Sequence, residues 1–182
     1  MQNIIKSKIP VFVLSLFLFL FSLEINAMQS VPEDKFQIHG SNHSNENDDI
    51  ILVDENGNKI ALSELKGKVV FINFWATWCR PCVEEMSTLN KLRNKFRGND
   101  EIVFVFLNVE ANLTKSKKFM KDKNYDLAVY VAGDNIPSKY FQGAIPTTLI
   151  FNKKGELEAQ IQGGRDFDQP QIYEALNTLT EQ

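Results

Sequence analysis

Two cysteines are the residues in this sequence best suited to chemistry. The chain contains Cys79 and Cys82 and no other cysteine, with Arg80 and Pro81 between them. Any disulfide within the chain therefore joins these neighbours and cannot link distant parts of the fold. A pair at this spacing suits thiol–disulfide exchange, in which one thiolate attacks a disulfide and the second thiol releases the captured partner.

The elements around the pair suggest different roles for its two members. The apolar stretch Val69 to Trp75 predicts a strand buried on both faces, and the apolar residues from Val83 to Phe96 recur at helical spacing. Cys79 therefore lies where a helix begins, and unpaired amides and the helix dipole favour a thiolate there. We expect Cys79 to be an exposed nucleophile and Cys82, one turn later, to be the resolving thiol.

The two residues between the cysteines modulate the pair. Pro81 has the backbone φ of a first helical turn and stiffens the segment at little cost. Arg80 adds a positive charge that favours the thiolate of Cys79, unless Glu84 and Glu85 offset it.

A metal site and a purely structural disulfide are the alternatives for this pair. Zinc would need two more ligands, and the available histidines, His39 and His43, lie in a polar segment without rigid support. A disulfide between such close neighbours closes a short loop and adds little stability. We therefore predict a redox pair with no metal and no cofactor.

The first fifty residues predict export. Basic residues precede the apolar run Ile9 to Leu23, which is followed by Ala27, a small residue suited to signal cleavage. We assign residues 1–27 to a signal peptide or an uncleaved membrane anchor, 28–49 to a flexible polar tether and 50–182 to the folded domain. The predicted location is periplasmic or otherwise extracytoplasmic.

The order of predicted elements gives the fold class. The 20 basic and 23 acidic residues give a net charge of −3, so no positive field favours binding to nucleic acid. We also expect the protein to be a monomer. A strand–helix–strand–helix half precedes a hairpin and a final helix, which predicts an α/β domain whose mixed central sheet is flanked by helices. The later segments are a strand at 102–109, a helix at 114–123, a hairpin at 147–162 and a helix starting at Pro170, and an extra N-terminal hairpin is expected at 50–62.

Three segments resemble thioredoxin-like proteins, and most closely the exported TlpA/ResA type of disulfide reductase. They are Phe74 to Cys82, Gly143 to Phe151 and the pair Gly163-Gly164. The resemblance extends over Ile50 to Thr180 and implies a thioredoxin fold. It also implies that Ile145-Pro146 is the family's cis-proline element, against which an extended substrate pairs as a short added strand.

The resemblance further implies a rim for substrates around Cys79. Trp78, Ile145, Pro146 and Gly163 would form this shallow apolar rim. The alternative for Trp78 is a core aromatic, because tryptophan is largely buried on average.

One position departs from ordinary thioredoxins, which have a buried aspartate where this chain has Asn73. Because an amide cannot exchange a proton, another group must help to deprotonate Cys82. Glu85 is the first candidate, since TlpA/ResA-type proteins place a functional glutamate there, and Glu110 is the second. The alternative for both is a solvated surface carboxylate.

We therefore expect an exported protein-disulfide reductase. Its predicted partners are protein disulfide substrates, such as apocytochrome c during cytochrome c biogenesis, and a membrane-embedded electron donor that reduces it again. The alternatives are a disulfide-forming oxidase and a binding module without turnover. A thiol peroxidase is disfavoured because Ala76 occupies the position of the threonine in the peroxiredoxin motif.

Overall fold

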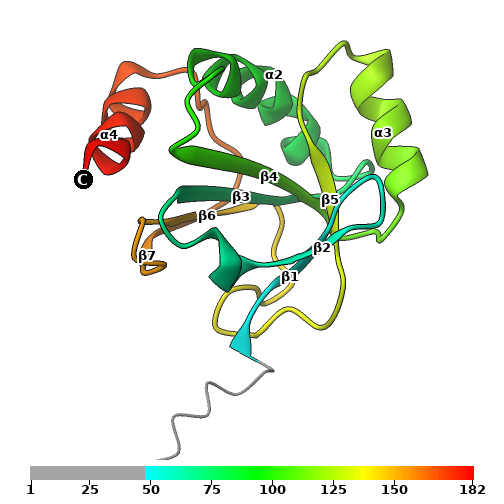
Figure 1. The fold of residues 1–182 in the computed structure, drawn as a ribbon. Helices are drawn as coiled ribbons and strands as arrows, with labels where there is room; N and C mark the ends of the chain where they lie inside the picture. Colours follow the sequence, from blue (N-terminus) through cyan, green and yellow to red (C-terminus); the bar gives the residue numbers. More distant parts are fainter. Residues whose placement is uncertain (1–47) are drawn as a thin grey trace, which may run out of the picture. The chain divides into compact units, whose positions relative to one another are not determined.

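The computed structural model describes residues 48–182 (Figure 1). The predicted signal or anchor at 1–27 and nearly all of the predicted tether at 28–49 lie outside these residues. The elements in chain order are β1 (Ile51–Val53), β2 (Lys59–Ala61), the 3-10 helix η3 (Leu62–Leu65), β3 (Val69–Trp75), α2 (Arg80–Lys95), β4 (Ile102–Asn108), α3 (Leu113–Asp122), β5 (Val129–Ala132), β6 (Thr147–Phe151), β7 (Leu157–Gln162) and α4 (Pro170–Glu181). Within this described part, no helix has the length and apolar character needed to cross a membrane.

The strands form one mixed sheet in the order β2-β1-β5-β4-β3-β6-β7. The inner strands β3, β4 and β5 run parallel, whereas β6 is antiparallel to β3 and β7 is antiparallel to β6. On the other side, β1 pairs antiparallel with both β2 and β5. The predicted α/β class with a mixed central sheet is confirmed.

Strand β3 is the centre of the sheet and is buried along its whole length. Its side chains alternate between two apolar clusters, because successive residues of a strand point to opposite faces. Val69, Phe71 and Trp75 pack in the cluster that contains both cysteines, whereas Val70, Ile72 and Phe74 pack in the other. Asn73 belongs to the series that faces the cysteines, and it is the polar residue of β3.

The three α-helices between residues 48 and 182 all contribute to the cluster that contains the cysteines. Helix α2 supplies Met86, Leu89 and Leu92, α3 supplies Met120 and α4 supplies Leu176. Figure 1 shows α2 above the strands, with α3 and α4 on either side of it. The opposite face is covered in part by η3 and by the turn at 136–141, where Phe141 stacks on Phe74 at 4.6 Å between ring centroids.

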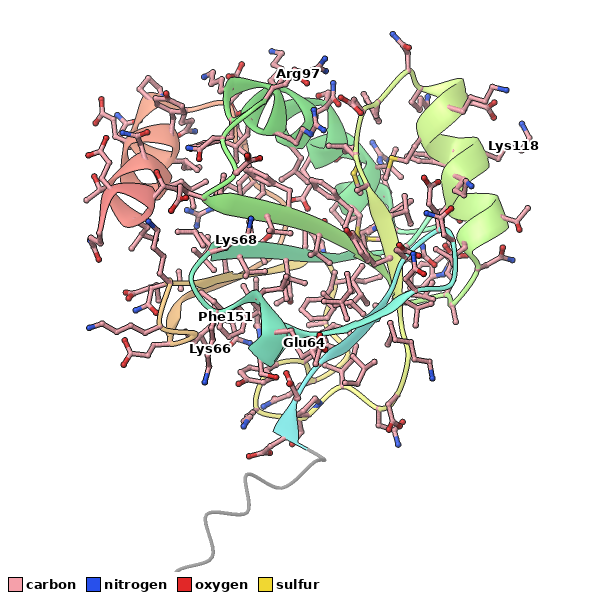
Figure 2. All side chains as sticks on the ribbon, in the orientation of Figure 1. Glu64, Lys66, Lys68, Arg97, Lys118 and Phe151 are labelled. Carbon is pink, nitrogen blue, oxygen red and sulfur yellow. A yellow bond between two sulfur atoms is a disulfide. The ribbon has the colours of Figure 1, made fainter. Side chains whose placement is uncertain are left out.

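Charged side chains lie on the outside of this arrangement. Arg97, just beyond α2, and Lys118 of α3 project away from the sheet (Figure 2). Because the long polar side chains remain in water, the interior between α2 and the sheet is apolar except at a few positions. Those positions include Asn73, Glu85 and Thr148, which are buried and joined by hydrogen bonds from Asn73 to the other two.

Candidate active site

The cysteine pair lies at the junction that the sequence predicts. Strand β3 ends at Trp75, and Cys79 is the N-cap of α2 in an extended conformation. Cys79 and Cys82 are joined in a disulfide. The backbone N–H of Cys82 points at Cys79 Sγ from 3.3 Å, so an amide of the first helical turn is aimed at the nucleophilic sulfur. In the reduced protein this amide would favour the thiolate of Cys79.

The expectation that Cys79 is exposed is wrong for the disulfide form. The residue is 4% exposed and Cys82 is fully buried, because both pack into the main apolar cluster. Cys79 is nevertheless the more accessible of the two. In this oxidised form an incoming thiolate therefore reaches Cys79 first, which agrees with the predicted role of Cys79 as the residue that forms the mixed disulfide.

Glu85 is a buried carboxylate one helical turn beyond Cys82. It is 4% exposed, so the alternative of a solvated surface group is wrong for this residue. Its Oε1 accepts a hydrogen bond from Asn73 Nδ2 at 2.9 Å, and its Oε2 accepts one from the Arg165 N–H at 3.1 Å. Burial raises the pKa of Glu85 from 4.5 to about 7, although both hydrogen bonds oppose this rise. Glu85 can therefore take up or release a proton near neutral pH.

An open depression of about 520 Å³ connects Glu85 to the surface. It lies between the start of α2 and the segment that follows β7. The residues that line it are Pro81, Glu84, Glu85, Thr88, Gly164, Arg165 and Asp166. Water in this depression could receive a proton from Glu85 on the side away from Asn73.

The positive charge expected beside Cys79 is largely offset. Arg80 forms an ion pair with Glu84 at 2.8 Å, and both side chains are exposed. This pairing raises the pKa of Arg80. Because Glu84 neutralises the guanidinium, Arg80 adds less to thiolate stabilisation than its charge alone suggests.

Glu110 has a different environment from Glu85. Its carboxylate accepts hydrogen bonds from the backbone N–H and the hydroxyl of Thr77, from Lys115 Nζ at 2.6 Å and from Asn108 Nδ2 at 3.3 Å. Burial acts to raise its pKa, but these bonds outweigh burial and lower the pKa from 4.5 to about 2. Glu110 stays ionised at neutral pH, so of the two carboxylates Glu85 is the one that can exchange a proton there.

The glycine pair joins the proline loop to the start of α2. The Ile145–Pro146 peptide bond is cis, as the resemblance implies. The Gly163 N–H donates to the Pro146 carbonyl at 2.9 Å, and a Cβ on Gly164 would lie 3.4 Å from Pro81. Ile145 packs against the cluster that holds both cysteines. Pro146 and Gly163 of the predicted rim are therefore joined to each other, and the neighbouring Gly164 lies beside Pro81 of the cysteine turn.

Trp78 is exposed, with 68% of its surface accessible, so its alternative assignment to the core is wrong. Three residues that the sequence analysis did not select complete the site. Thr77 holds Glu110, the backbone of Arg165 holds Glu85, and Thr148 Oγ1 accepts from Asn73 Nδ2 at 3.0 Å. Thr148 could have been found, because a polar residue inside an apolar strand requires a partner.

Between positions 48 and 182, no three residues among His, Cys, Asp and Glu are grouped to hold a metal ion. The alternative zinc ligands His39 and His43 lie outside this range.

Comparison with known proteins places the chain in a family. Residues 27–176, most of the chain, match the redoxin family. The chain belongs to the redoxin family. Among its relatives, the thiol-disulfide oxidoreductase ResA of Bacillus cereus is 36% identical over 126 residues, which span 68% of this chain and 71% of that protein. ResA of Bacillus subtilis is 31% identical over 130 residues, which span 71% of each protein.

A solved structure of a thioredoxin-family protein agrees with this placement. A thiol:disulfide interchange protein of the thioredoxin family from Chlorobium tepidum superimposes with a TM-score of 0.58 at 27% identity, over 71% of this chain and 93% of that one. The thioredoxin fold expected from the sequence is therefore confirmed. With its Cys79–Cys82 disulfide, this redoxin is a thiol–disulfide oxidoreductase.

The low pKa of Glu110 predicts that the folded protein loses stability in acid. Its pKa in the folded protein is about 2, below its ordinary 4.5, so the stabilisation from its ionised form is present above pH 4.5 and is lost as the pH falls toward 2. We expect the free energy of unfolding of Glu110→Gln to lie below that of the wild type near neutral pH. Denaturant titrations at a series of pH values should show this gap closing in acid.

Glu174→Gln is the control for that series, because Glu174 is an exposed carboxylate on α4. It should follow the acid dependence of the wild type. A gap between wild type and Glu110→Gln that stays constant down to low pH would show that the contacts of Glu110 do not depend on its charge.

The raised pKa of Glu85 predicts that the rate of the resolving step depends on pH. Since Glu85 titrates near pH 7, the rate at which Cys82 attacks a mixed disulfide on Cys79 should rise with pH through that value. Glu85→Gln should lack this inflection and be slower by about 10²-fold, the lower end for loss of a general base. Stopped-flow kinetics with a Cys79 mixed disulfide measure the step directly.

Glu84→Gln is the matched control for the kinetics, because Glu84 is the adjacent but exposed carboxylate. It should keep the inflection near pH 7. An unchanged pH profile in Glu85→Gln would exclude Glu85 as the proton acceptor and leave Glu110 as the remaining candidate.

Proposed function

We propose that this protein is an exported reductase of protein disulfides that acts through the Cys79–Cys82 dithiol. The main support is the position of the pair at the start of α2, with an amide aimed at Cys79 Sγ and a buried carboxylate one turn beyond Cys82. This arrangement distinguishes the two thiols, since one receives the helix N-terminus and the other has Glu85 nearby.

The reaction transfers two electrons from the protein to its substrate. The thiolate of Cys79 attacks one sulfur of the substrate disulfide, which forms a mixed disulfide and releases the first substrate thiolate. Cys82 then attacks Cys79 Sγ, which forms the Cys79–Cys82 disulfide and releases the second substrate thiolate. The substrate is reduced to a dithiol, and the protein ends in the disulfide state seen in the structure.

Glu85 accepts the proton of Cys82 in the second step. Cys82 is fully buried, so its thiol has no direct contact with bulk water. Glu85 lies one turn along the same helix and also lines the open depression beside Gly164 and Arg165. A proton that moves from Cys82 to Glu85 can then leave through this depression.

The charges around the pair support a reducing direction. A site that strongly stabilises the Cys79 thiolate stabilises the reduced protein and makes the pair an oxidant. Here Glu84 offsets Arg80, and the buried Glu85 adds negative charge near the dithiol. Both effects reduce the stabilisation of a thiolate and so favour the disulfide over the dithiol.

The substrate site proposed here is the apolar rim of Trp78, Ile145, Pro146 and Gly163. Exposed Trp78 supplies contact area, and the resemblance implies that an extended substrate segment pairs with the loop at Ile145-Pro146. A polypeptide with a surface disulfide fits such an open rim, whereas a small disulfide gains little from it. Apocytochrome c is the substrate that the resemblance to TlpA/ResA-type proteins suggests.

The proposed place of action is outside the cytoplasmic membrane. The sequence pattern of residues 1–27 supports export, either with cleavage or as an anchor. Since an oxidising compartment does not return the pair to the dithiol state, a membrane-embedded electron donor must do so.

The redox potential tests the direction of electron flow. We expect a potential near that of thioredoxin, about −270 mV, and a value near about −120 mV would identify an oxidase instead. Equilibration with glutathione or dithiothreitol buffers, followed by Trp fluorescence or thiol trapping, measures it. Glu84→Gln should shift the potential to less negative values, because it frees the charge of Arg80 to stabilise the Cys79 thiolate.

Trapping tests the roles of the two thiols. Cys82→Ser should accumulate a mixed disulfide between Cys79 and the substrate, because the resolving thiol is missing. Cys79→Ser is the matched control and should trap nothing and fail to reduce insulin. Equal insulin reduction by the wild type and Cys79→Ser would contradict the exchange mechanism and favour a binding module.

A further inference from the structure

Asn73 has an unusual set of hydrogen bonds for a buried amide. It is fully buried in β3, and its Nδ2 donates both to Glu85 Oε1 at 2.9 Å and to Thr148 Oγ1 at 3.0 Å. Its Oδ1 is buried and has no hydrogen-bond partner among the described residues. The amide therefore uses both of its donors and leaves its acceptor unused, which carries a cost in a protein interior.

We propose that Asn73 is a positioning residue, which Thr148 orients so that an N–H faces Glu85 and stabilises its ionised form. This inference rests on the proposed function, in which Glu85 takes the proton of Cys82. It assigns to Asn73 an active part in that step, beyond filling a buried site.

The sheet register explains how Thr148 orients the amide. Asn73 and Thr148 are direct partners across the antiparallel pair β3–β6, so their side chains lie side by side on the face that α2 covers. The Thr148 hydroxyl oxygen accepts one Nδ2 hydrogen, which leaves the other directed at Glu85. The opposite orientation of the amide would place Oδ1 against the carboxylate and remove this donor.

Among the groups that surround Glu85, Asn73 is a main determinant of whether the Glu85 carboxyl is ionised. On α2 the neighbours are Cys82 and Glu84, and the segment after β7 supplies the Arg165 N–H together with the charged side chains of Arg165 and Asp166. The strands β3 and β6 present the neutral Asn73 and Thr148. Of the two hydrogen bonds to the carboxylate, the one from Asn73 is the shorter, at 2.9 Å against 3.1 Å.

The test measures the titration of Glu85 itself. Asn73→Leu keeps a similar side-chain volume and removes the donor, so we expect the Glu85 midpoint to rise above the wild-type value near 7 by about one pH unit, as expected for one hydrogen bond to a carboxylate. Carbon-13 NMR of labelled glutamate side chains in the oxidised full chain follows the titration. The spectrum of Glu85→Gln identifies the resonance.

Thr148→Val keeps the inference testable if Asn73→Leu does not fold. It removes the hydroxyl that orients the amide while preserving shape, and we expect a smaller rise of the Glu85 midpoint. The matched control is Thr180→Val, because Thr180 is a buried threonine of α4 whose hydroxyl donates to the Asn177 carbonyl. This control should leave the Glu85 midpoint unchanged.

The pH profile of the resolving step is the second measurement. Its inflection should move in parallel with the Glu85 midpoint, a change that mere loss of stability does not produce. A Glu85 midpoint equal to the wild-type value in a folded Asn73→Leu or Thr148→Val protein would overturn the inference. Insulin reduction by the wild type is independent of that result, so failure here and failure of the proposed reductase activity can be told apart.

Discussion

The burial of one carboxylate, one helical turn beyond Cys82, constrains the rest of the site. An ionisable group with 4% exposure must find hydrogen-bond donors inside the protein, and Glu85 finds them on two separate segments. Asn73 comes from the central strand, and the Arg165 N–H comes from the chain after β7. Glu85 keeps both of these bonds only when both segments are in place, so the carboxylate ties the cysteine helix to the sheet and to the segment that follows Gly163-Gly164.

Glu85 and Glu110 have different roles because their surroundings give them different pKa values. Glu85 has two neutral donors and deep burial, which leaves its pKa near 7, whereas Glu110 has a lysine and Thr77 as partners and stays ionised. A group that is always charged makes a poor proton carrier but a good anchor. Glu110 holds Thr77, the residue next to Trp78, and so fixes the loop that leads from β3 to Cys79.

The sequence predicts the chemistry of the cysteine pair better than it predicts the polar contacts around that pair. The apolar stretch of β3, the helical spacing of α2 and the two cysteines are local patterns, and local patterns placed Cys79 correctly at the helix start. Glu85 was selected through family resemblance, because its burial depends on which face of α2 meets the sheet. The contact with Arg165 uses a backbone N–H, which has no side-chain signal, and the low exposure of Cys79 depends on the packing of distant segments.

Charge balance explains why a buried cysteine and a buried glutamate can work together. If Cys82 lost its proton to water while Glu85 was ionised, two negative charges would share a poorly solvated space, which is strongly disfavoured. Transfer of the proton from Cys82 to Glu85 keeps one negative charge in the site throughout. The N–H from Asn73 favours the carboxylate before transfer, and burial favours the neutral acid after it. The balance between these two effects places Glu85 near neutral pH, where it can act in both directions.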